Sequence, residues 1–455
     1  MRLARCASVL VISAALWPGL AGCDRANHDN IERWLSTEKG VEKLTKALRD
    51  GDNDADVRAH AAQNLIVHNF TPQLGTVKEA LEDMSDAERK DVMTALVPRL
   101  WEKARIAHEK DVPTPVQSQA KDALFELRGS ADEATRQKID GYLVEWLAGG
   151  YYEGRATSGR VSGRTIIRQL GPIAGPKLLE SARSVLVRPP DAEGKRPIVG
   201  DELLAAIAST GDPQAVGFLL DLVLKDYKEP TLPKRALSAL FEAYVQPVSG
   251  QPVPSRPALV GQADRLGEVA RNENLPGQMN NDAAYLLVAV GPPECIPPLV
   301  EMARLPSAQR SFRAVGLQMG LRCGGAQAMA PVLEAVPATL EYDRGYLDHY
   351  VVSELLKAPG AAKVAEQARA LLSSQSWVAR VAAIEILAAL KQRATAEDDA
   401  KRIRQLARDH TVLKGWWGPQ KDAPAGKKKP DPTIGQIAEE VAGGLQALAK
   451  GPESK

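Results

Sequence analysis

Aromatic residues, cysteines and net charge are all scarce in this chain of 455 residues. Aromatic residues make up 5% of it, and 58 Lys and Arg nearly balance 57 Asp and Glu. A nearly neutral chain presents no global positive field, which argues against binding to nucleic acid. Four cysteines are too few for a disulfide framework, six histidines are scattered, and no CxxC, HExxH or GxSxG pattern occurs. We therefore expect no catalytic, metal or cofactor site.

The N-terminal segment has the layout of an exported precursor. Residues 1–5 (MRLAR) are basic, and residues 6–17 (CASVLVISAALW) form an apolar run that is typical of a secretory signal and too short to span a membrane. The next stretch, LAGC, resembles a bacterial lipobox, which implies a diacylglyceryl group on the thiol of Cys23 and removal of residues 1–22. A plain signal peptide with a chance cysteine is the alternative. No later stretch is long and apolar enough to span.

Asp24, directly after that cysteine, resembles the signal that retains many Gram-negative lipoproteins in the inner membrane. We therefore expect a mature chain that is lipid-anchored in a bacterial cell envelope and faces the periplasm or the outside, with the inner membrane slightly favoured. Residues 24–30 (DRANHDN) are polar and predict a short tether. Residues 23–36 would then comprise the lipidated cysteine, this tether and the start of the first helix.

From residue 31 onward the sequence predicts helix after helix and almost no strand. In residues 130–147 (SADEATRQKIDGYLVEWL) the apolar residues recur at helical spacing, and Ser130 with Glu133 has the spacing of a capping box. Ser85 and Glu88 repeat that spacing. Each apolar stripe ends at a Gly, Pro or polar cluster after about a dozen residues, which predicts short amphipathic helices.

Several of these helices belong to an internal repeat. Segments 210–223 (TGDPQAVGFLLDLV), 290–303 (VGPPECIPPLVEMA) and 323–336 (CGGAQAMAPVLEAV) align without gaps, and 170–182 (LGPIAGPKLLESA) joins them after one deletion. An Ala-rich apolar helix precedes the aligned segments. A glycine that ends one helix and a proline that starts the next predict two antiparallel neighbours. The aligned glycines are Gly211, Gly291 and Gly324.

DVRAHAA (56–62) and GDPQAV (211–216) resemble HEAT repeats in their short bacterial form. The resemblance covers the chain in patches and implies an all-α fold, an α-solenoid (superhelix) of HEAT-like helix pairs, over about 37–417. One helix pair cannot bury its apolar stripe alone, so stacked pairs form a continuous core. The resemblance also implies a solenoid surface that recognises a protein partner. Some HEAT-like repeats belong to lyases that attach chromophores to proteins, which is the enzymatic alternative.

Proline-rich segments interrupt the helical pattern and predict loops at 188–199 and 246–258. Residues 418–433 (GPQKDAPAGKKKPDPT) predict a flexible Pro/Lys-rich linker. Residues 434–455 predict a final amphipathic helix and tail, which either caps the array or remains loosely attached.

Two loops partly match ligand-binding motifs. GRATSGRV (154–161) has the glycine spacing of a phosphate-binding loop, but Arg160 and Val161 stand where that loop needs Lys and Ser or Thr. DNDADV (52–57) opens like a calcium loop but lacks its glycine. We interpret the first as a turn between helices and the second as the acidic N-terminus of the next helix.

Arginines spaced by four residues follow a pair of tyrosines and predict a basic stripe on one helix face. Such a stripe can hold an acidic peptide or a phosphate-bearing ligand, and a solvated helix face is the alternative. The residues concerned are Tyr151, Tyr152, Arg155, Arg160, Arg164 and Arg168.

Trp416 and Trp417 follow the last clear repeat helix. They are candidates for an exposed aromatic binding spot, and the alternative is that they fold back to close the hydrophobic end of the stack.

Cys295 and Cys323 lie in successive repeat elements, and an exported chain can be oxidised. They are a candidate disulfide, with two buried free thiols as the alternative, because sequence spacing does not reveal the distance between their Cα atoms.

The expected function is non-covalent recognition of a protein partner by a membrane-anchored, non-catalytic scaffold. No cofactor, small-molecule substrate or nucleic acid is expected. An enzyme or accessory protein of the lyase type would instead have a deep pocket lined by converging ionisable residues, and a purely structural envelope protein is the third alternative.

Overall fold

The computed structural model describes residues 25–68, 73–108, 112–150, 152–190, 192–193, 197–225, 231–247, 253–306, 310–419 and 429–450. Within these residues the fold is all-α, as predicted, and β-type pairing is limited to one isolated bridge between Val412 and Thr433. The chain divides into two compact units, Met1–Ala206 (unit 1) and Ile207–Lys455 (unit 2).

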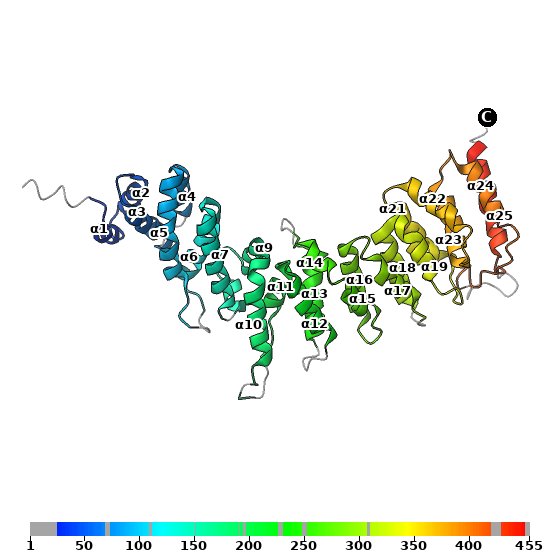
Figure 1. The fold of residues 1–455 in the computed structure, drawn as a ribbon, viewed down its shortest axis with the longest axis horizontal. Coiled ribbons are helices and arrows are strands. Elements are labelled where there is room, and N and C mark those ends of the chain that lie inside the picture. Colours follow the sequence, from blue (N-terminus) through cyan, green and yellow to red (C-terminus); the bar gives the residue numbers. More distant parts are fainter. Residues whose placement is uncertain are drawn as a thin grey trace, which may run out of the picture. The chain divides into compact units, whose positions relative to one another are not determined.

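Unit 1 is a solenoid of short helices (Figure 1). Helices that pack together are close in chain order: α3 contacts α2, α4 and α5, and α7 contacts α5, α6 and α10. Such local stacking, in which each pair completes the core of the next, characterises solenoids. The helices are α1 (His28–Trp34), α2 (Gly40–Arg49), α3 (Ala55–Val67), α4 (Gln73–Glu82), α5 (Asp86–Ala104), α6 (Pro115–Leu127), η1 (Arg128–Ser130), α7 (Glu133–Ala148), α8 (Tyr152–Ala156), α9 (Gly163–Leu170), η2 (Gly171–Ala174) and α10 (Gly175–Val187).

Unit 2 repeats this HEAT-like arrangement, with contacts between successive helices such as α15 with α16, α17 with α18 and α22 with α23. Helix α11 (Asp201–Ser209) contains the boundary between the units. The remaining helices are α12 (Pro213–Leu224), α13 (Leu232–Tyr244), α14 (Arg256–Val260), α15 (Ala263–Arg271), α16 (Gly277–Val290), α17 (Ile296–Arg304), α18 (Arg310–Gly324), η3 (Gly325–Ala328), α19 (Met329–Ala335), α20 (Arg344–Leu347), the π-helical turn η4 (Asp348–Val352), α21 (Ser353–Lys357), α22 (Ala361–Leu371), α23 (Trp377–Leu390), α24 (Ala396–Arg404) and α25 (Ile434–Lys450).

Glycines in the left-handed backbone region separate the two helices of several pairs. Gly211 has φ 63° and Gly291 has φ 76°, as their aligned positions predict. In the third aligned segment the left-handed residue is Gly325, with φ 51°, and the aligned Gly324 closes α18 instead. A Cβ at Gly324 would lie 2.8 Å from Ile296 Cδ1, so this glycine allows close packing of α18 on α17.

Only one of the two predicted capping boxes forms. Ser85 and Glu88 make both reciprocal hydrogen bonds at the start of α5, which confirms that prediction. The prediction for Ser130 and Glu133 is wrong, because Ser130 ends the 3-10 turn η1 and the helix starts three residues later. The side chain of Asp132 caps α7 instead and accepts a hydrogen bond from the backbone N–H of Thr135 at 2.9 Å.

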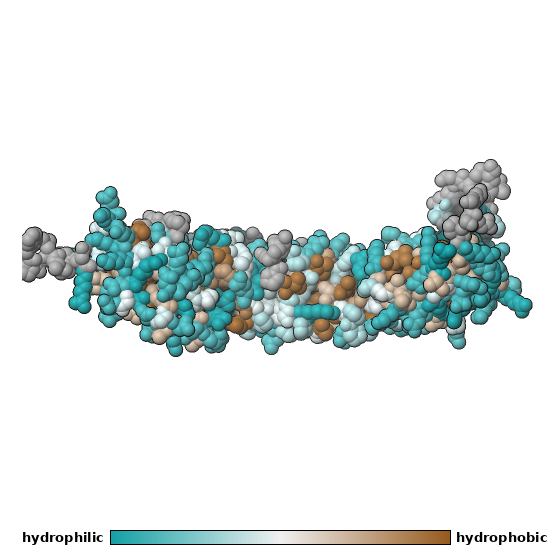
Figure 2. All heavy atoms as spheres, turned by 90° about the horizontal axis from the view of Figure 1, so that it is seen from above, coloured by the Kyte–Doolittle hydropathy of each residue, from teal (hydrophilic) through white to brown (hydrophobic). Residues whose placement is uncertain are grey.

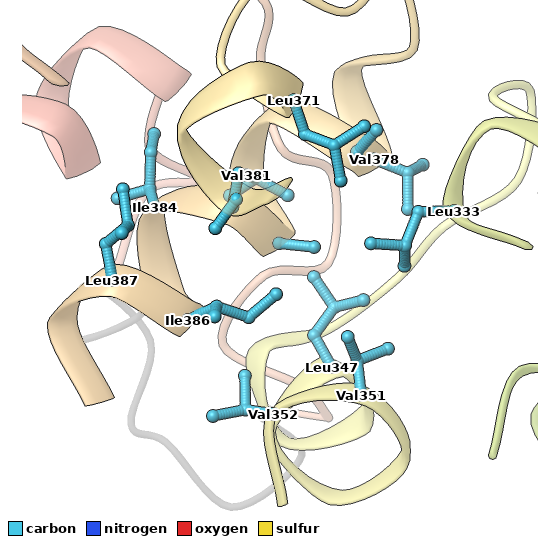
Figure 3. Close-up of a cluster of buried hydrophobic side chains, with 14 of the residues drawn as sticks. Leu333, Leu347, Val351, Val352, Leu371, Val378, Val381, Ile384, Ile386 and Leu387 are labelled. Atoms are coloured by element: carbon cyan, nitrogen blue, oxygen red, sulfur yellow. The ribbon is translucent and has the colours of Figure 1, made fainter. Parts of the chain in front are cut away.

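Helix α23 forms the centre of the core of unit 2, because it is surrounded by α19, α22, α25 and η4. Its buried side chains therefore occupy every face of the helix rather than one stripe. Figure 3 shows Val378, Val381 and Ile386 pointing toward side chains of neighbouring elements, including Leu371 and Leu347. The composition WVARVAAIEIL thus suits a fully enclosed helix.

The C-terminal helix α25 caps the end of unit 2. Ile437, Ala442 and Leu445 are buried, and the helix packs against α23 and α24. Leu413 N donates a hydrogen bond to Pro432 O at 2.8 Å, which ties the chain before α25 to the loop after α24. Of the two alternatives for this segment, the capping role is therefore the one observed. Residues 420–428 of the predicted linker lie outside the described residues.

A disulfide joins Cys295, which precedes α17, to Cys323 near the end of α18, with their Cα atoms 6.6 Å apart. Cys295 is fully buried. The bond cross-links the second helix of one HEAT-like pair to the first helix of the next.

Among the described residues, no helix is both long and apolar enough to cross a bilayer. The predicted signal segment, with Cys23 and Asp24, lies outside the described residues, and the lipid anchor stays a prediction.

Candidate functional site

The predicted basic stripe does not form on one helix face. The side chain of Ser162 caps α9, so the helix begins at Gly163 and Arg160 lies in the preceding turn. Arg155 and Tyr152 belong to the short helix α8 and are both buried, and Arg155 Nη1 donates a hydrogen bond to Trp146 O at 2.9 Å. The sequence spacing fails here because a helix start lies between the arginines. Tyr151 lies outside the described residues.

The remaining arginines of the predicted stripe are held by other groups. Arg160 forms an ion pair with Glu126 at 3.2 Å, and Arg164 forms one with Glu202, also at 3.2 Å. Arg168 is half-buried and also has an interaction partner. Because acidic side chains neutralise two of these charges, the surface around α9 is not a strong attractor for anions.

The Gly-rich loop at 154–161 does bind an anion, but the anion is the side chain of Asp122 on α6. Arg160 N donates to Asp122 Oδ2 at 2.6 Å, and Val161 N donates to Oδ1 at 3.2 Å. Gly159 has φ 84°, and a Cβ there would lie 2.6 Å from Asp122 Oδ2. A carboxylate of the chain itself thus occupies the place of a phosphate, and the interpretation of the loop as a turn between helices agrees with the structure.

Lys121, next to that aspartate, is buried under the same loop. Its Nζ donates to Ser158 O at 2.8 Å and to Val161 O at 2.6 Å, and it lies 5.4 Å from the centre of the Trp146 ring. Burial lowers the pKa of Lys121, and the neighbouring Asp122 carboxylate opposes that shift. The buried pair therefore fixes the loop on α6 and leaves no free charge for a ligand.

The acidic loop before α3 uses its charges within the protein. Asp56 receives two hydrogen bonds from Arg99 Nη2 at 2.9 Å and one from Arg99 Nε at 3.0 Å. Asp54 is at the N-cap position but makes no side-chain capping bond. Among the residues that the structure describes, no group of three or more His, Cys, Asp or Glu side chains is arranged to hold a metal ion.

A groove of about 700 Å³ on unit 1 is the surface hollow that we identify as a candidate functional site. Its walls come from α7, α8, α10 and the segment that leads into α11. The hydroxyl of Ser181 on α10 donates to Ala148 O at the end of α7 at 2.6 Å, and this bond holds two of the walls together. The apolar lining residues are Ala148, Val185, Pro197, Ile198 and Leu203.

The charged residues of this groove are Glu145, Glu153, Glu180, Lys177 and Arg188. Two of the three carboxylates are already engaged: Glu180 pairs with Lys177 at 2.7 Å, and Glu153 accepts a hydrogen bond from Leu203 N at 3.3 Å. The third carboxylate, that of Glu145, is exposed and is in no side-chain hydrogen bond or ion pair with the described residues, although its charge contributes to raising the pKa of Lys177. An apolar surface beside an available carboxylate can bind a chain segment that carries an apolar side chain next to a basic one.

Only an indirect signal for the groove is present in the sequence. The Pro-rich segment at 188–199 is recognisable as a loop, and part of that loop, with Ile198 51% exposed, forms one wall. Which helices it faces depends on contacts with α7 and α8, which are about 50 residues away in sequence, as the Glu153–Leu203 hydrogen bond illustrates. Local patterns carry no information about such pairs.

A second, shallower hollow of about 440 Å³ lies on unit 2, beside the π-helical turn η4. The guanidinium of Arg310 lies 4.5 Å from the centre of the Tyr346 ring, and His349 and Tyr350 meet edge to face at 4.6 Å. Arg310 also pairs with Asp343. The aromatic rings here contact one another and the arginine, so this hollow is a weaker candidate for ligand binding than the groove on unit 1.

The tryptophan pair folds back on the end of unit 2. Trp416 is fully buried in the core, and Trp417 is half-buried, with its Nε1 donating to Pro430 O at 3.0 Å. The ammonium of Lys429 lies 4.7 Å from the centre of the Trp417 ring. The candidate role as an exposed aromatic spot is therefore wrong for Trp416, because the loop after α24 turns this ring inward.

Exposed hydrophobic residues do not gather into one large patch on the face drawn in Figure 2, where brown areas are small and separated by teal ones. On unit 1 the most exposed include Ile173 in the turn η2, Val187 at the end of α10, and Ile198 in the groove wall. The groove is therefore distinguished by its shape and its charges rather than by an extended apolar surface.

No protein-family model matches the chain, and no curated protein matches it in sequence. Among solved structures, the chain is similar to a mutant of Kap121p, with a TM-score of 0.35 and 14% identity over 96% of this chain and 47% of that one. It is similar to Kap121p bound to Ste12p, with a TM-score of 0.31 and 13% identity over 93% and 42% of the two chains. Human deoxyhypusine hydroxylase gives a TM-score of 0.23 and 16% identity over 79% and 97%. The chain spans less than half the length of these Kap121p chains.

Proposed function

We propose that this chain is a non-catalytic protein-binding scaffold, anchored by a lipid on Cys23 in a bacterial cell envelope, that captures an extended segment of a partner protein in the groove on unit 1. The observation that supports it most directly is the groove itself, about 700 Å³ in volume, with apolar walls beside the available carboxylate of Glu145. A cavity of this size can hold several side chains of a partner segment. HEAT-like stacking supplies rigid helices as its walls.

The alternatives predict other arrangements. A lyase-type enzyme needs converging ionisable groups, whereas the groove charges are divided between a Lys177–Glu180 pair, a carboxylate bonded to Leu203 N, and the side chains of Glu145 and Arg188. A purely structural envelope protein would bind nothing in the groove. Two experiments test the groove and the anchor independently, and the first also separates the structural alternative from the scaffold.

The first experiment introduces a photo-crosslinking residue at Ser184 in the groove wall and irradiates intact envelopes. We expect a discrete adduct with one protein, and we expect the additional substitution Glu145→Lys to reduce its yield about fivefold, because it places a repelling charge where a basic side chain would bind. Glu133→Lys, an exposed acid on the same helix α7, is the matched control. An adduct that both substitutions leave unchanged would contradict the role of the groove, and the absence of any adduct would favour the structural alternative.

The second experiment replaces Cys23 with serine and follows incorporation of labelled palmitate and the membrane fraction. We expect an unprocessed, unlabelled precursor, because only a thiol forms the thioether to the diacylglyceryl group. Cys6→Ser, within the segment that cleavage removes, should leave labelling and fractionation as in the wild type. Normal labelling of Cys23→Ser would exclude the anchor while leaving the groove untested by this measurement.

A further inference from the structure

Two histidines bind each other between the first helix and the third. His28 Nδ1 on α1 lies 2.9 Å from His60 Nδ1 on α3. The other nitrogen of each ring faces a carboxylate on the opposite helix: His60 Nε2 lies 2.7 Å from Glu32 Oε1, and His28 Nε2 lies 3.2 Å from Asp56 Oδ2. Three polar contacts in a row therefore connect α1 to α3.

The carboxylates determine where the protons of these rings are. An ionised carboxylate can only accept, so His60 Nε2 carries the hydrogen that it donates to Glu32. In a neutral ring the other nitrogen is then an acceptor, so His60 Nδ1 accepts a hydrogen bond from His28 Nδ1–H. The hydrogen bond between the two rings therefore requires that His60 Nδ1 carries no proton.

The surroundings keep His60 neutral. Its side chain is 10% exposed, and burial lowers its pKa, although its hydrogen bond to Glu32 opposes the shift. The charges acting on its ring come from Glu32 and His28 on α1 and from Arg99 on α5, which is itself bound to Asp56.

Glu32 remains an acceptor under the same conditions. Burial raises its pKa, but hydrogen bonds from Asn64 and His60 outweigh burial, and the charge of His68 acts in the same direction, so that the pKa is lowered. Asn64 Nδ2 donates to Glu32 Oε1 at 3.3 Å. On acidification His60 therefore changes its charge while its carboxylate partner is still ionised.

We propose that the His28–His60 hydrogen bond is an acid-sensitive latch that holds α1 on α3 and releases it when the environment is acidified. A proton added to His60 Nδ1 turns the acceptor into a donor that faces another donor. Because the pKa of His60 is lower in the folded chain than in the unfolded one, the stabilising contribution of neutral His60 is complete above about pH 6.5 and is lost as the pH falls through that lowered value.

Besides the latch, α1 is held by the hydrogen bond from Asn64 to Glu32 and by two buried apolar side chains. It has seven residues, too few for a helix that is stable by itself. It contacts α2 and α3, and its buried apolar side chains are Ile31 and Trp34. Opening of the latch would expose both of these side chains together with the face of α3 beneath them. The proposal concerns this end of unit 1 and does not depend on the groove.

Amide hydrogen exchange on the full chain tests the latch. After correction for the intrinsic pH dependence of exchange, we expect the amides of residues 28–34 to exchange about tenfold faster at pH 5.0 than at pH 7.5, since the hydrogen bond between the two rings is lost. The amides of α5 between residues 92 and 100 serve as an internal reference and should not change. Equal protection of α1 at the two pH values would overturn the proposal.

Substitutions identify the side chain that is responsible for the pH dependence of exchange in α1. His60→Asn provides an amide oxygen that accepts a hydrogen bond but cannot be protonated in this range, so the ratio of exchange rates at the two pH values should fall to about one. His28→Ala removes the hydrogen bond between the rings at every pH, so the amides of α1 should exchange equally fast at pH 5.0 and at pH 7.5. His410→Asn, an exposed histidine of unit 2, is the control and should behave as the wild type. A pH response that persists in His60→Asn, or release of α1 by a chelator at pH 7.5, would overturn the proposal, the latter by showing that a metal ion joins the two nitrogens.

Discussion

Replacing Asp122 with alanine is expected to destabilise unit 1 by about 3–5 kcal/mol, the largest effect that we anticipate for a single polar side chain in this protein. The substitution leaves the ammonium of Lys121, which is 1% exposed, without its counter-charge. It also leaves the backbone N–H groups of Arg160 and Val161 without their acceptor. Urea unfolding followed by circular dichroism measures the free energy.

Two further variants separate the contributions. Asp122→Ala combined with Lys121→Met should recover part of the lost free energy, because the unpaired charge is then absent. Asp91→Ala, an exposed aspartate on α5, is the control and should change stability by less than about 0.5 kcal/mol. A loss below about 1 kcal/mol for Asp122→Ala would contradict the structural role assigned to the buried pair.

Replacing Glu354 is expected to weaken unit 2 in a pH-dependent manner. Its carboxylate, 4% exposed, accepts hydrogen bonds from Arg322 Nε at 3.0 Å and from Gln318 Nε2 at 2.9 Å. Burial raises the pKa of Glu354, but these bonds and one from Lys357 outweigh it and lower the pKa to about 2. Glu354→Gln should cost about 2–3 kcal/mol at pH 7, as expected for bonds to a charged group.

The sign of the pH dependence follows from the lowered pKa. In the wild type the contribution of Glu354 is complete above pH 4.5, its ordinary value, and is lost as the pH falls toward about 2. The difference in unfolding free energy between the wild type and Glu354→Gln should therefore shrink steadily between pH 4.5 and pH 2. Glu366→Gln, an exposed residue on α22, is the matched control. A difference that stays constant over this range would show that Glu354 does not titrate as the structure requires.

The helix pairs and their turns are the part of the fold that could be predicted. Capping at Ser85 and left-handed glycines at positions 211 and 291 depend on residues within one or two turns of each other. The two exceptions are also local. A 3-10 turn moves the cap of α7 away from Ser130, and the additional glycine Gly325 takes the left-handed conformation that was predicted for Gly324.

The candidate site was much less accessible to prediction. The basic stripe was inferred from i, i+4 spacing, which is valid only while the helix continues, and Ser162 starts a new helix between Arg160 and Arg164. The burial of Arg155 under the end of α7 has no counterpart in the local sequence. The groove itself is built from three stretches that no local pattern brings together.

By itself the sequence determined an all-helical chain of HEAT-like pairs, because caps, apolar spacing and left-handed glycines act over a few residues. Only the tertiary structure decided which polar groups are available and which are already engaged. Asp122 and Arg160 are 38 positions apart, and His28 and His60 are 32 apart. Residues that are about one helix pair apart in the sequence come into contact because successive pairs stack. This stacking depends on the shape of the whole core rather than on any short stretch of sequence.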